Sequence, residues 1–365
     1  MKTRFRTVLS ICLVISWIGC VPAISAGETP DILETYFPGN DGDWKTDIPE
    51  SRGINSVASE EAYKRITSNG RTYSFLVVKD GYLVVEYYAD GYDENSIFAF
   101  NSCTKSITSA VLGIAMDNGL VGDVTTRIAA YFPELEEDGD KEDITIEHLL
   151  TMTAGWDWPE WSTWNYMLAP WVRSENWVDF VLERNQLYSP GTMFAYNTGA
   201  SQLLSAIIQK AAGIPEDEYA HAQLFDKIGM TSIHWDRDPQ GVTLGGFGLY
   251  MTSRDAARFG LLYCSQGKWE EEQVVSEQWV NASTQKHANG HRYFSPYGYH
   301  WWVDTIGVSG KQIPMFYAMG FGGQYLFILP EINMVAVFAS DPGSSANSVI
   351  PLSAFKTYVG EALGS

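Results

Sequence analysis

Apolar residues gather in short blocks of strand length near both ends of the chain. Residues 73–88 contain two such blocks around Asp80-Gly81, a dipeptide typical of tight hairpin turns. Residues 325–339 contain two more, on either side of a Pro-Glu-Ile-Asn turn. The pattern therefore predicts a β-hairpin from each end of the chain, and a terminal helix after the second hairpin, over about 348–363.

Between the two hairpins, apolar positions recur every three or four residues, which is the spacing of one helix face. The clearest case is the segment 100–119, where Ile107, Val111 and Ile114 share a face and an Asn-Gly pair supplies an end signal. Further helices are expected over residues 59–69, 145–155, 199–212, 216–228 and 253–263, the last with Ser253 as its N-cap.

Strands at both ends and helices in the middle predict an α+β fold. The simplest arrangement is a central antiparallel sheet made from the N- and C-terminal hairpins, flanked by helices, with a helical lobe inserted. We place the α/β lobe at about 55–118 and 241–365 and the helical lobe at about 119–240, within a single catalytic domain over residues 27–365. We expect the functional site to lie in the groove between the two lobes.

The first 26 residues are typical of a secretory signal peptide. Three cations precede an apolar run at 8–18 that is too short to span a bilayer comfortably, and small residues lead up to Ala26. An alternative is a lipoprotein signal ending at Cys20, although Trp17 stands where a smaller aliphatic residue is expected. We expect a secreted or periplasmic protein, with no membrane contact unless Cys20 is lipidated.

The mature chain is strongly acidic. Removing residues 1–26 deletes three positive charges and no negative ones, so the formal net charge of −20 becomes −23. Nucleic acids and anionic membranes bind clustered Lys and Arg, so neither is an expected partner. Cys103 and Cys264 lie in apolar helical contexts, where buried free thiols are expected rather than a disulfide.

Ser102 and Lys105 stand three residues apart at the start of the predicted helix over 100–119, so they would share one face. A lysine in an apolar pocket loses its proton more readily, and the neutral amine can take the proton of a neighbouring hydroxyl. Backbone N–H groups at a helix start suit a developing oxyanion. The spacing alone also fits a serine N-cap with a solvated lysine, and Cys103 is a competing nucleophile without a partner pattern.

Three separated motifs, taken in order, resemble the serine β-lactamase and penicillin-binding superfamily. They are Ser102-Cys-Thr-Lys105 at a helix start, Tyr196 just before another helix, and Gly320-Phe-Gly-Gly-Gln-Tyr325 at the start of a strand. The resemblance covers nearly the whole mature chain. It is greatest for the class C β-lactamase-like branch, which includes family VIII esterases and 6-aminohexanoate-dimer hydrolases.

The resemblance implies a role for each motif. Ser102 would be the acylated nucleophile, with Lys105 and Tyr196 as its proton relay. A phenol beside a lysine ammonium is stabilised as phenolate, which would let Tyr196 act first as base and then as acid. The backbone N–H groups of Ser102 and Gln324 would form the oxyanion hole. Gly322 and Gly323 would let the strand edge approach the substrate closely.

Two departures from the family pattern bear on the substrate. The family's Tyr-x-Asn is here Tyr196-Asn197-Thr198, so the asparagine is displaced by one place from the position where the family's asparagine contacts the substrate amide. Phe321 stands where a cation of β-lactamases and D,D-peptidases binds the substrate carboxylate, and a phenylalanine cannot do so. The tryptophan-rich loop over residues 156–171, which contains the candidate substrate-binding residues Trp156 and Trp158, either roofs the core or lines an apolar cleft.

We therefore expect a secreted serine hydrolase that cleaves a small ester or amide through a Ser102 acyl-enzyme. Two alternatives stay open: a β-lactamase or D-alanyl-D-alanine carboxypeptidase, and a non-catalytic protein that binds wall fragments. No cofactor or metal is expected, because the Asn-Gly pair between His287 and His291 breaks the helix that would place them on one face.

Overall fold

The computed structural model describes residues 35–39, 44–68, 70–139, 141–160, 167–291, 294–343 and 348–363. Residues Thr35–Ser365 form one compact unit. The signal peptide predicted at 1–26, with the alternative lipidation site Cys20, lies outside the described residues. No helix within the described ranges is both long and apolar enough to cross a membrane.

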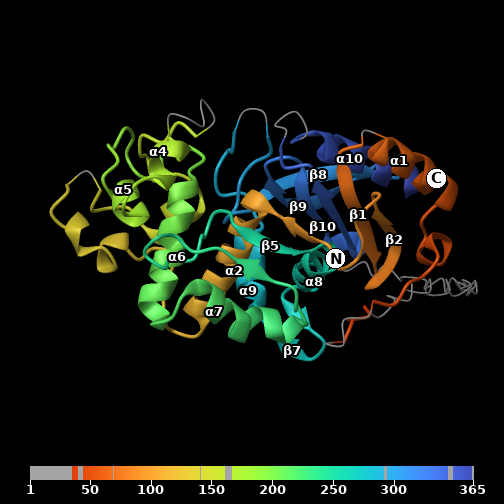
Figure 1. The fold of residues 1–365 in the computed structure, drawn as a ribbon, viewed down its shortest axis with the longest axis horizontal. Coiled ribbons are helices and arrows are strands. Elements are labelled where there is room, and N and C mark those ends of the chain that lie inside the picture. The colour runs from red at the N-terminus through yellow and green to blue at the C-terminus, as the bar shows by residue number, and fades with distance from the viewer. Residues whose placement is uncertain are drawn as a thin grey trace, which may run out of the picture. The chain divides into compact units, whose positions relative to one another are not determined.

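A six-stranded antiparallel sheet forms the core of the fold, and its strands come from both ends of the chain (Figure 1). The strand order is β2-β1-β11-β10-β9-β8. The predicted α+β class is confirmed, and so is one antiparallel sheet that joins the two terminal hairpins. The strands β8 and β9, which the sequence analysis did not predict, extend this sheet. The strands are β1 (Thr72–Lys79), β2 (Tyr82–Tyr88), β8 (Trp302–Val308), β9 (Lys311–Gly320), β10 (Gln324–Leu329) and β11 (Met334–Ser340).

The pairing of β1 with β11 joins the two ends of the chain, and there Phe75 lies opposite Phe338. Every residue of β10 and β11 is buried, so helices cover both faces of the sheet. On one face Phe355 packs against Phe338, and on the other Gly260 lies against Val335. The covering helices are α1 (Ser56–Thr67) and α10 (Ile350–Ala362) on the first face and α8 (Ser253–Cys264) on the second.

Helix α2 is the central helix of the remaining part, and its residues from Thr104 to Ala115 are all buried. It contacts α6, α7 and α9. The helices are α2 (Thr104–Asp117), α3 (Ile146–Leu150), α4 (Leu168–Val172), α5 (Trp177–Leu182), α6 (Thr198–Ala212), α7 (Glu216–Ala220) and α9 (Glu277–Ser283). A π-helical turn, η5 (His221–Phe225), and a 3-10 turn, η6 (Asp226–Ile228), continue α7.

Short elements complete the fold. The small strands are β3 (Ile97–Ala99), β4 (His234–Trp235) and β5 (Leu249–Thr252) in one sheet, and β6 (Lys268–Trp269) and β7 (Glu272–Gln273) in another. The 3-10 turns are η1 (Pro49–Arg52), η2 (Asn101–Cys103), η3 (Ile128–Ala130), η4 (Pro133–Leu135) and η7 (Pro330–Ile332). Two of them lie in predicted segments: η7 in the Pro-Glu-Ile-Asn turn and η2 at the start of the helix predicted over 100–119.

One predicted cap is wrong. The N-cap of α8 is Thr252, whose extended backbone lets its hydroxyl accept a hydrogen bond from the Asp255 N–H. Ser253 is instead the first helical residue, and its hydroxyl bonds that of Ser74 on β1. Both residues suit a cap, so only the position of the sheet decides between them.

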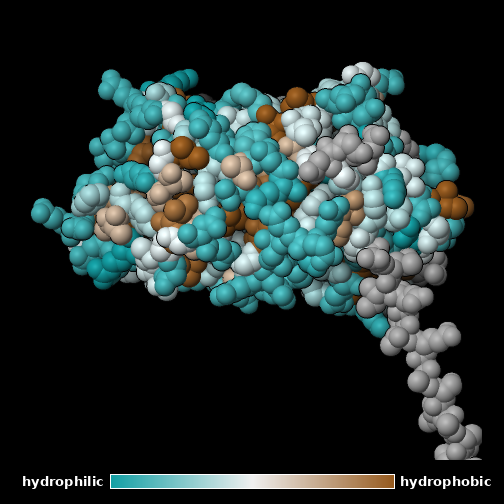
Figure 2. Space-filling view, turned by 90° about the horizontal axis from the view of Figure 1, so that it is seen from below, coloured by the Kyte–Doolittle hydropathy of each residue, from teal (hydrophilic) through white to brown (hydrophobic). Residues whose placement is uncertain are grey.

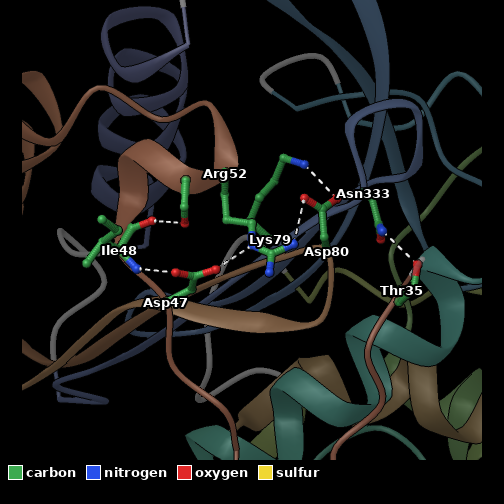
Figure 3. Close-up of polar contacts among 8 residues, drawn as sticks. Thr35, Asp47, Ile48, Arg52, Lys79, Asp80 and Asn333 are labelled. Carbon is green, nitrogen blue, oxygen red and sulfur yellow. Dashed lines mark hydrogen bonds and ion pairs between the residues drawn. The ribbon is translucent and has the colours of Figure 1, made fainter. Parts of the chain in front are cut away.

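The chain before α1 is held to the β1–β2 turn by polar contacts (Figure 3). The Tyr36 N–H donates to the Asp80 carbonyl oxygen over 3.1 Å, and the Arg52 guanidinium lies 3.9 Å from the Asp80 carboxylate. The Asn333 amide, in the turn before β11, donates to the Thr35 hydroxyl over 2.7 Å. Gly81 has φ +85°, and a Cβ there would stand 1.7 Å from the Tyr36 carbonyl oxygen. The turn therefore needs glycine both for its backbone angle and for this close approach.

In Figure 2 one face of the molecule is mostly hydrophilic, with apolar side chains in small separate groups. Cys103 and Cys264 are both free and buried, as predicted from their apolar helical contexts.

Glu216 is an unusual buried group at the start of α7. The residue is fully buried, and within the described part of the chain neither of its carboxyl oxygens has a hydrogen-bond partner. Burial raises the pKa of Glu216 to about 8, and the nearby Ser205 and Thr108 hydroxyls oppose part of this rise. The folded protein therefore keeps a proton on Glu216 that the unfolded chain has already lost at neutral pH.

Because the folded state binds more protons than the unfolded state, stability should fall as pH rises from about 4.5 to about 8. The contribution of Glu216 to this slope is up to about 1.4 kcal/mol per pH unit. We expect Glu216→Gln to flatten the pH dependence of the free energy of unfolding, measured by reversible urea denaturation. The exposed Glu183→Gln is the matched control and should keep the wild-type slope. Parallel curves for wild type and Glu216→Gln would contradict the prediction.

Candidate active site

Ser102 lies in the 3-10 turn η2, between strand β3 and helix α2, and is partly exposed. The turn begins at Asn101, whose φ of +47° is in the left-handed region that asparagine tolerates better than most residues. The Asn101 amide donates to the Phe321 carbonyl over 2.8 Å. Ser102 is thus presented on a sharp turn that is fastened to the β9–β10 connection.

Lys105 is buried at the start of α2 and donates to three acceptors. Its Nζ lies 3.1 Å from Ser102 Oγ, 3.0 Å from Thr198 Oγ1 and 2.8 Å from the Gly246 carbonyl oxygen. An ammonium has three donors, so this set uses all of them. Burial lowers the pKa of Lys105 to about 8, although the negative charge of Glu160 opposes the shift.

Tyr196 precedes α6 and its side chain is buried beside Lys105. The lysine nitrogen stands 4.9 Å from the centre of the phenol ring, and the ring stacks on Trp302 at 6.1 Å. Burial raises the pKa of Tyr196 well above its usual value, Glu160 adds to the rise, and a hydrogen bond with Ser102 only partly opposes it. Desolvation thus outweighs the expected stabilisation of a phenolate, and Tyr196 is a neutral phenol in the free protein.

The backbone after β9 lies directly against the Ser102 turn. A Cβ on Gly320 would stand 2.4 Å from the Phe100 carbonyl oxygen, and the Cys103 thiol donates to the Gln324 carbonyl over 3.5 Å. The Gln324 side chain bonds both backbone groups of Ser340. The two segments that carry the expected oxyanion donors, the N–H groups of Ser102 and Gln324, are therefore neighbours.

Gly322 and Gly323 form the tight connection that makes this approach possible. Their φ values are +84° and +93°, in the region that favours glycine. A Cβ on Gly322 would also stand 2.5 Å from Pro342. Phe321, between Gly320 and Gly322, has an exposed fraction of 52%. The residue next to the glycine connection is therefore an exposed phenylalanine, which carries no charge.

The structure gives Asn197 a role that the sequence did not suggest. Its side-chain oxygen accepts from the Ala200 N–H over 3.0 Å and caps α6, and the residue is buried. Thr198 instead contacts Lys105. The position two residues after Tyr196 therefore faces the catalytic lysine candidate, as its spacing in the family motif implies, but it carries a hydroxyl in place of an amide.

Glu160 is a site residue that sequence reasoning missed. Its Oε1 accepts from the Thr198 hydroxyl over 2.6 Å, and its Oε2 accepts from the Thr198 N–H over 2.7 Å and from the Trp158 indole N–H over 2.8 Å. Nothing in the local sequence pattern indicates this contact, because Glu160 and Thr198 are 38 residues apart. Its place in the tryptophan-rich loop was the only available signal.

Trp156 and Trp158 are both buried among core side chains. Trp158 meets Trp171 edge-on at 5.4 Å and packs over Gly199, where a Cβ would lie 2.8 Å from the indole ring. Of the two roles left open for this loop, both residues take the first, because they pack in the core, and Trp158 covers the start of α6. Trp161 and Trp164 lie outside the described residues.

Comparison with known proteins agrees with the fold and this arrangement, which together define a β-lactamase-fold hydrolase. The family model named Beta-lactamase matches residues 63–349. The chain therefore belongs to the Beta-lactamase family, as its three motifs indicated.

Several relatives share most of the chain. The 6-aminohexanoate-dimer hydrolase of Paenarthrobacter ureafaciens is 24% identical over 296 residues, which cover 73% of this chain and 71% of that protein. A Bacillus anthracis protein provisionally described as a 6-aminohexanoate-dimer hydrolase has a similar structure, with TM-score 0.69, 23% identity and coverage of 81% and 79%. A class C β-lactamase structure matches with TM-score 0.66, 16% identity and coverage of 87% and 99%.

The close approach at Gly320 is testable. Gly320→Ala would push β9 away from the Ser102 turn and misplace the Gln324 N–H, and loss of one oxyanion donor costs about 10²- to 10³-fold in rate. We expect labelling of Ser102 by a fluorophosphonate probe to slow by about this factor. Gly360→Ala, in open space on α10, is the matched control and should label at the wild-type rate. An unchanged rate in folded Gly320→Ala would contradict the prediction.

Proposed function

We propose that this protein is a serine hydrolase that cleaves a small ester or amide through an acyl-enzyme on Ser102. The observation that carries the proposal is the 3.1 Å contact between Lys105 Nζ and Ser102 Oγ, with the lysine buried. Because burial lowers the pKa of Lys105 to about 8, about a tenth of the lysine is neutral at pH 7. A neutral amine at this distance is a competent general base.

In the acylation step, Lys105 takes the proton of Ser102 as the serine oxygen attacks the carbonyl carbon. The backbone N–H groups of Ser102 and Gln324 stabilise the oxyanion that forms. Tyr196, a neutral phenol, donates its proton to the leaving alcohol or amine as the carbonyl re-forms. Lys105 then returns a proton to Tyr196, which leaves the acyl-enzyme with both relay groups in their starting states.

Deacylation repeats the sequence with water as the nucleophile. Lys105 accepts the proton of the attacking water, and it returns this proton to Ser102 Oγ as the carboxylic acid leaves. Each group therefore ends the cycle as it began. Such a cycle needs no metal, and in the described ranges no three His, Cys, Asp or Glu side chains are grouped so as to hold one.

The substrate proposal rests on Phe321. A phenylalanine with an exposed fraction of 52% beside the oxyanion strand supports contact with a neutral, apolar group rather than with a carboxylate. Short-chain esters and small amides fit this position better than penicillins or wall peptides. Relatives named as 6-aminohexanoate-dimer hydrolases support including a linear amide among the candidates. We also propose export through the signal peptide at residues 1–26.

A substrate panel tests the reaction. We expect wild type to hydrolyse short-chain p-nitrophenyl esters faster than nitrocefin, with 6-aminohexanoate dimer as the amide candidate. Ser102→Ala should lose at least about 10³-fold in kcat. Cys103→Ser, which keeps a donor toward the Gln324 carbonyl, is the matched control and should retain activity, because burial raises the pKa of that thiol well above its usual range. If wild type turns over none of these substrates and a fluorophosphonate does not label Ser102, the hydrolase proposal is wrong.

Phe321 gives a second test. Phe321→Lys should raise kcat/KM for a carboxylate-bearing substrate such as nitrocefin by up to about fivefold, because an exposed ion pair contributes roughly 1 kcal/mol or less. It should lower kcat/KM for neutral esters by a smaller factor. Phe321→Leu, which stays apolar, should leave the ratio of the two substrates unchanged. A higher kcat/KM for nitrocefin than for every ester in wild type would contradict the inference from Phe321.

A further inference from the structure

A continuous hydrogen-bonded chain leads from the candidate nucleophile to a carboxylate. Lys105 Nζ lies 3.1 Å from Ser102 Oγ and 3.0 Å from Thr198 Oγ1. The Thr198 hydroxyl, which accepts from Lys105, donates in turn to Glu160 Oε1 over 2.6 Å. A threonine hydroxyl has one donor and can accept at the same time, so it can serve both neighbours.

Both carboxylate oxygens of Glu160 accept hydrogen bonds. Besides the Thr198 hydroxyl it accepts the Thr198 backbone N–H and the Trp158 indole N–H. Trp158 is itself buried, edge-on to Trp171 and packed over Gly199. Three donors on one carboxylate leave it little rotamer freedom, so its charge is fixed relative to α6 and to Lys105.

The other ionisable groups that act on Lys105 are neutral near pH 7. Burial raises the pKa of Cys103 and of Tyr196 well above their usual values. Burial, with help from the Lys105 charge, lowers the pKa of His300 to about 3. Among the described groups that shift the pKa of Lys105, Glu160 is accordingly the carboxylate that opposes the effect of burial.

We infer that Glu160 is a positioning residue which, through the Thr198 hydroxyl, orients Lys105 toward Ser102 and stabilises the ammonium that forms when Lys105 takes the serine proton. The kinetic meaning of this inference rests on the proposed function. No proton moves to Glu160: the Thr198 proton stays between Thr198 and Glu160, and of these three residues Lys105 alone changes its protonation state. The pair Thr198–Glu160 thus takes the place of the asparagine that the family motif carries two residues after the tyrosine.

The pH profile distinguishes this role from simple structural support. Removing the negative charge in Glu160→Gln makes the Lys105 ammonium less stable. The limb of log kcat/KM that reports Lys105 should therefore move to lower pH, by about 0.5 to 1 unit. The plateau should fall by about tenfold, because the lysine becomes a weaker and less well oriented base. Measurement of p-nitrophenyl ester hydrolysis from pH 6 to pH 10 gives both quantities.

Three further variants separate the charge from the hydroxyl. Thr198→Val breaks the chain but keeps the Glu160 charge, so it should lower the plateau and move the limb by less than Glu160→Gln does. Thr198→Ser restores the hydroxyl and should recover at least half of wild-type kcat/KM. Trp158→Phe removes one donor to Glu160 Oε2 but leaves the link to Lys105. The limb of its pH profile of log kcat/KM should therefore coincide with that of wild type. Thermal denaturation checks that each variant is folded.

A direct titration tests the inference without any substrate. In protein labelled with ¹³C and ¹⁵N on lysine, the Lys105 signal is assigned by its loss in Lys105→Arg and followed by NMR against pH. The inference predicts that the Lys105 midpoint is lower in Glu160→Gln than in wild type. Coincident midpoints in the two folded proteins would overturn it. A wild type that titrates as expected but hydrolyses nothing would overturn the proposed reaction and leave the positioning role supported.

Discussion

The site depends on the burial of one amine. An ammonium placed in a protein interior loses its hydration and is tolerated only if acceptors replace the water. Lys105 finds three, on the Ser102 turn, on Thr198 at the start of α6, and on Gly246 before β5. The same contacts that satisfy the lysine therefore bring together three segments that are distant in the sequence. These acceptors replace the lost hydration only in part, so the pKa of Lys105 is lowered to about 8. The amine is then easier to deprotonate, as a general base must be.

The sheet positions the β9–β10 connection, which carries the second expected oxyanion donor. Because β1 pairs with β11, the two ends of the chain share one rigid scaffold, and the β9–β10 connection is carried to the Ser102 turn. The fit there is set by backbone rather than by side chains, since the Phe100 carbonyl leaves no room for a Cβ on Gly320. Two backbone segments held this closely can present N–H groups with little freedom to move, which is what stabilising an oxyanion requires.

Buried ionisable groups give this acidic protein an electrostatic pattern that its net charge does not describe. Lys105, His300 and Glu216 are all fully or almost fully buried, and burial shifts the pKa of each toward its neutral form. Beside the site, Glu160 accepts three hydrogen bonds, two from Thr198 and one from Trp158. A single fixed charge close to the lysine has more effect on its protonation than the many screened charges on the surface.

The sequence by itself determined the features that depend on neighbouring residues: the Asp80-Gly81 hairpin, the helix after Ser102, and the three-residue spacing that puts Ser102 and Lys105 on one face. The tertiary structure decided what depends on distant ones. It made Thr252 rather than Ser253 the cap of α8, gave Asn197 a capping role, kept Tyr196 neutral by desolvation, and brought Glu160 to Thr198 across 38 residues. Local patterns carry periodicity and capping preferences, whereas burial and long-range hydrogen bonds exist only once the elements have packed.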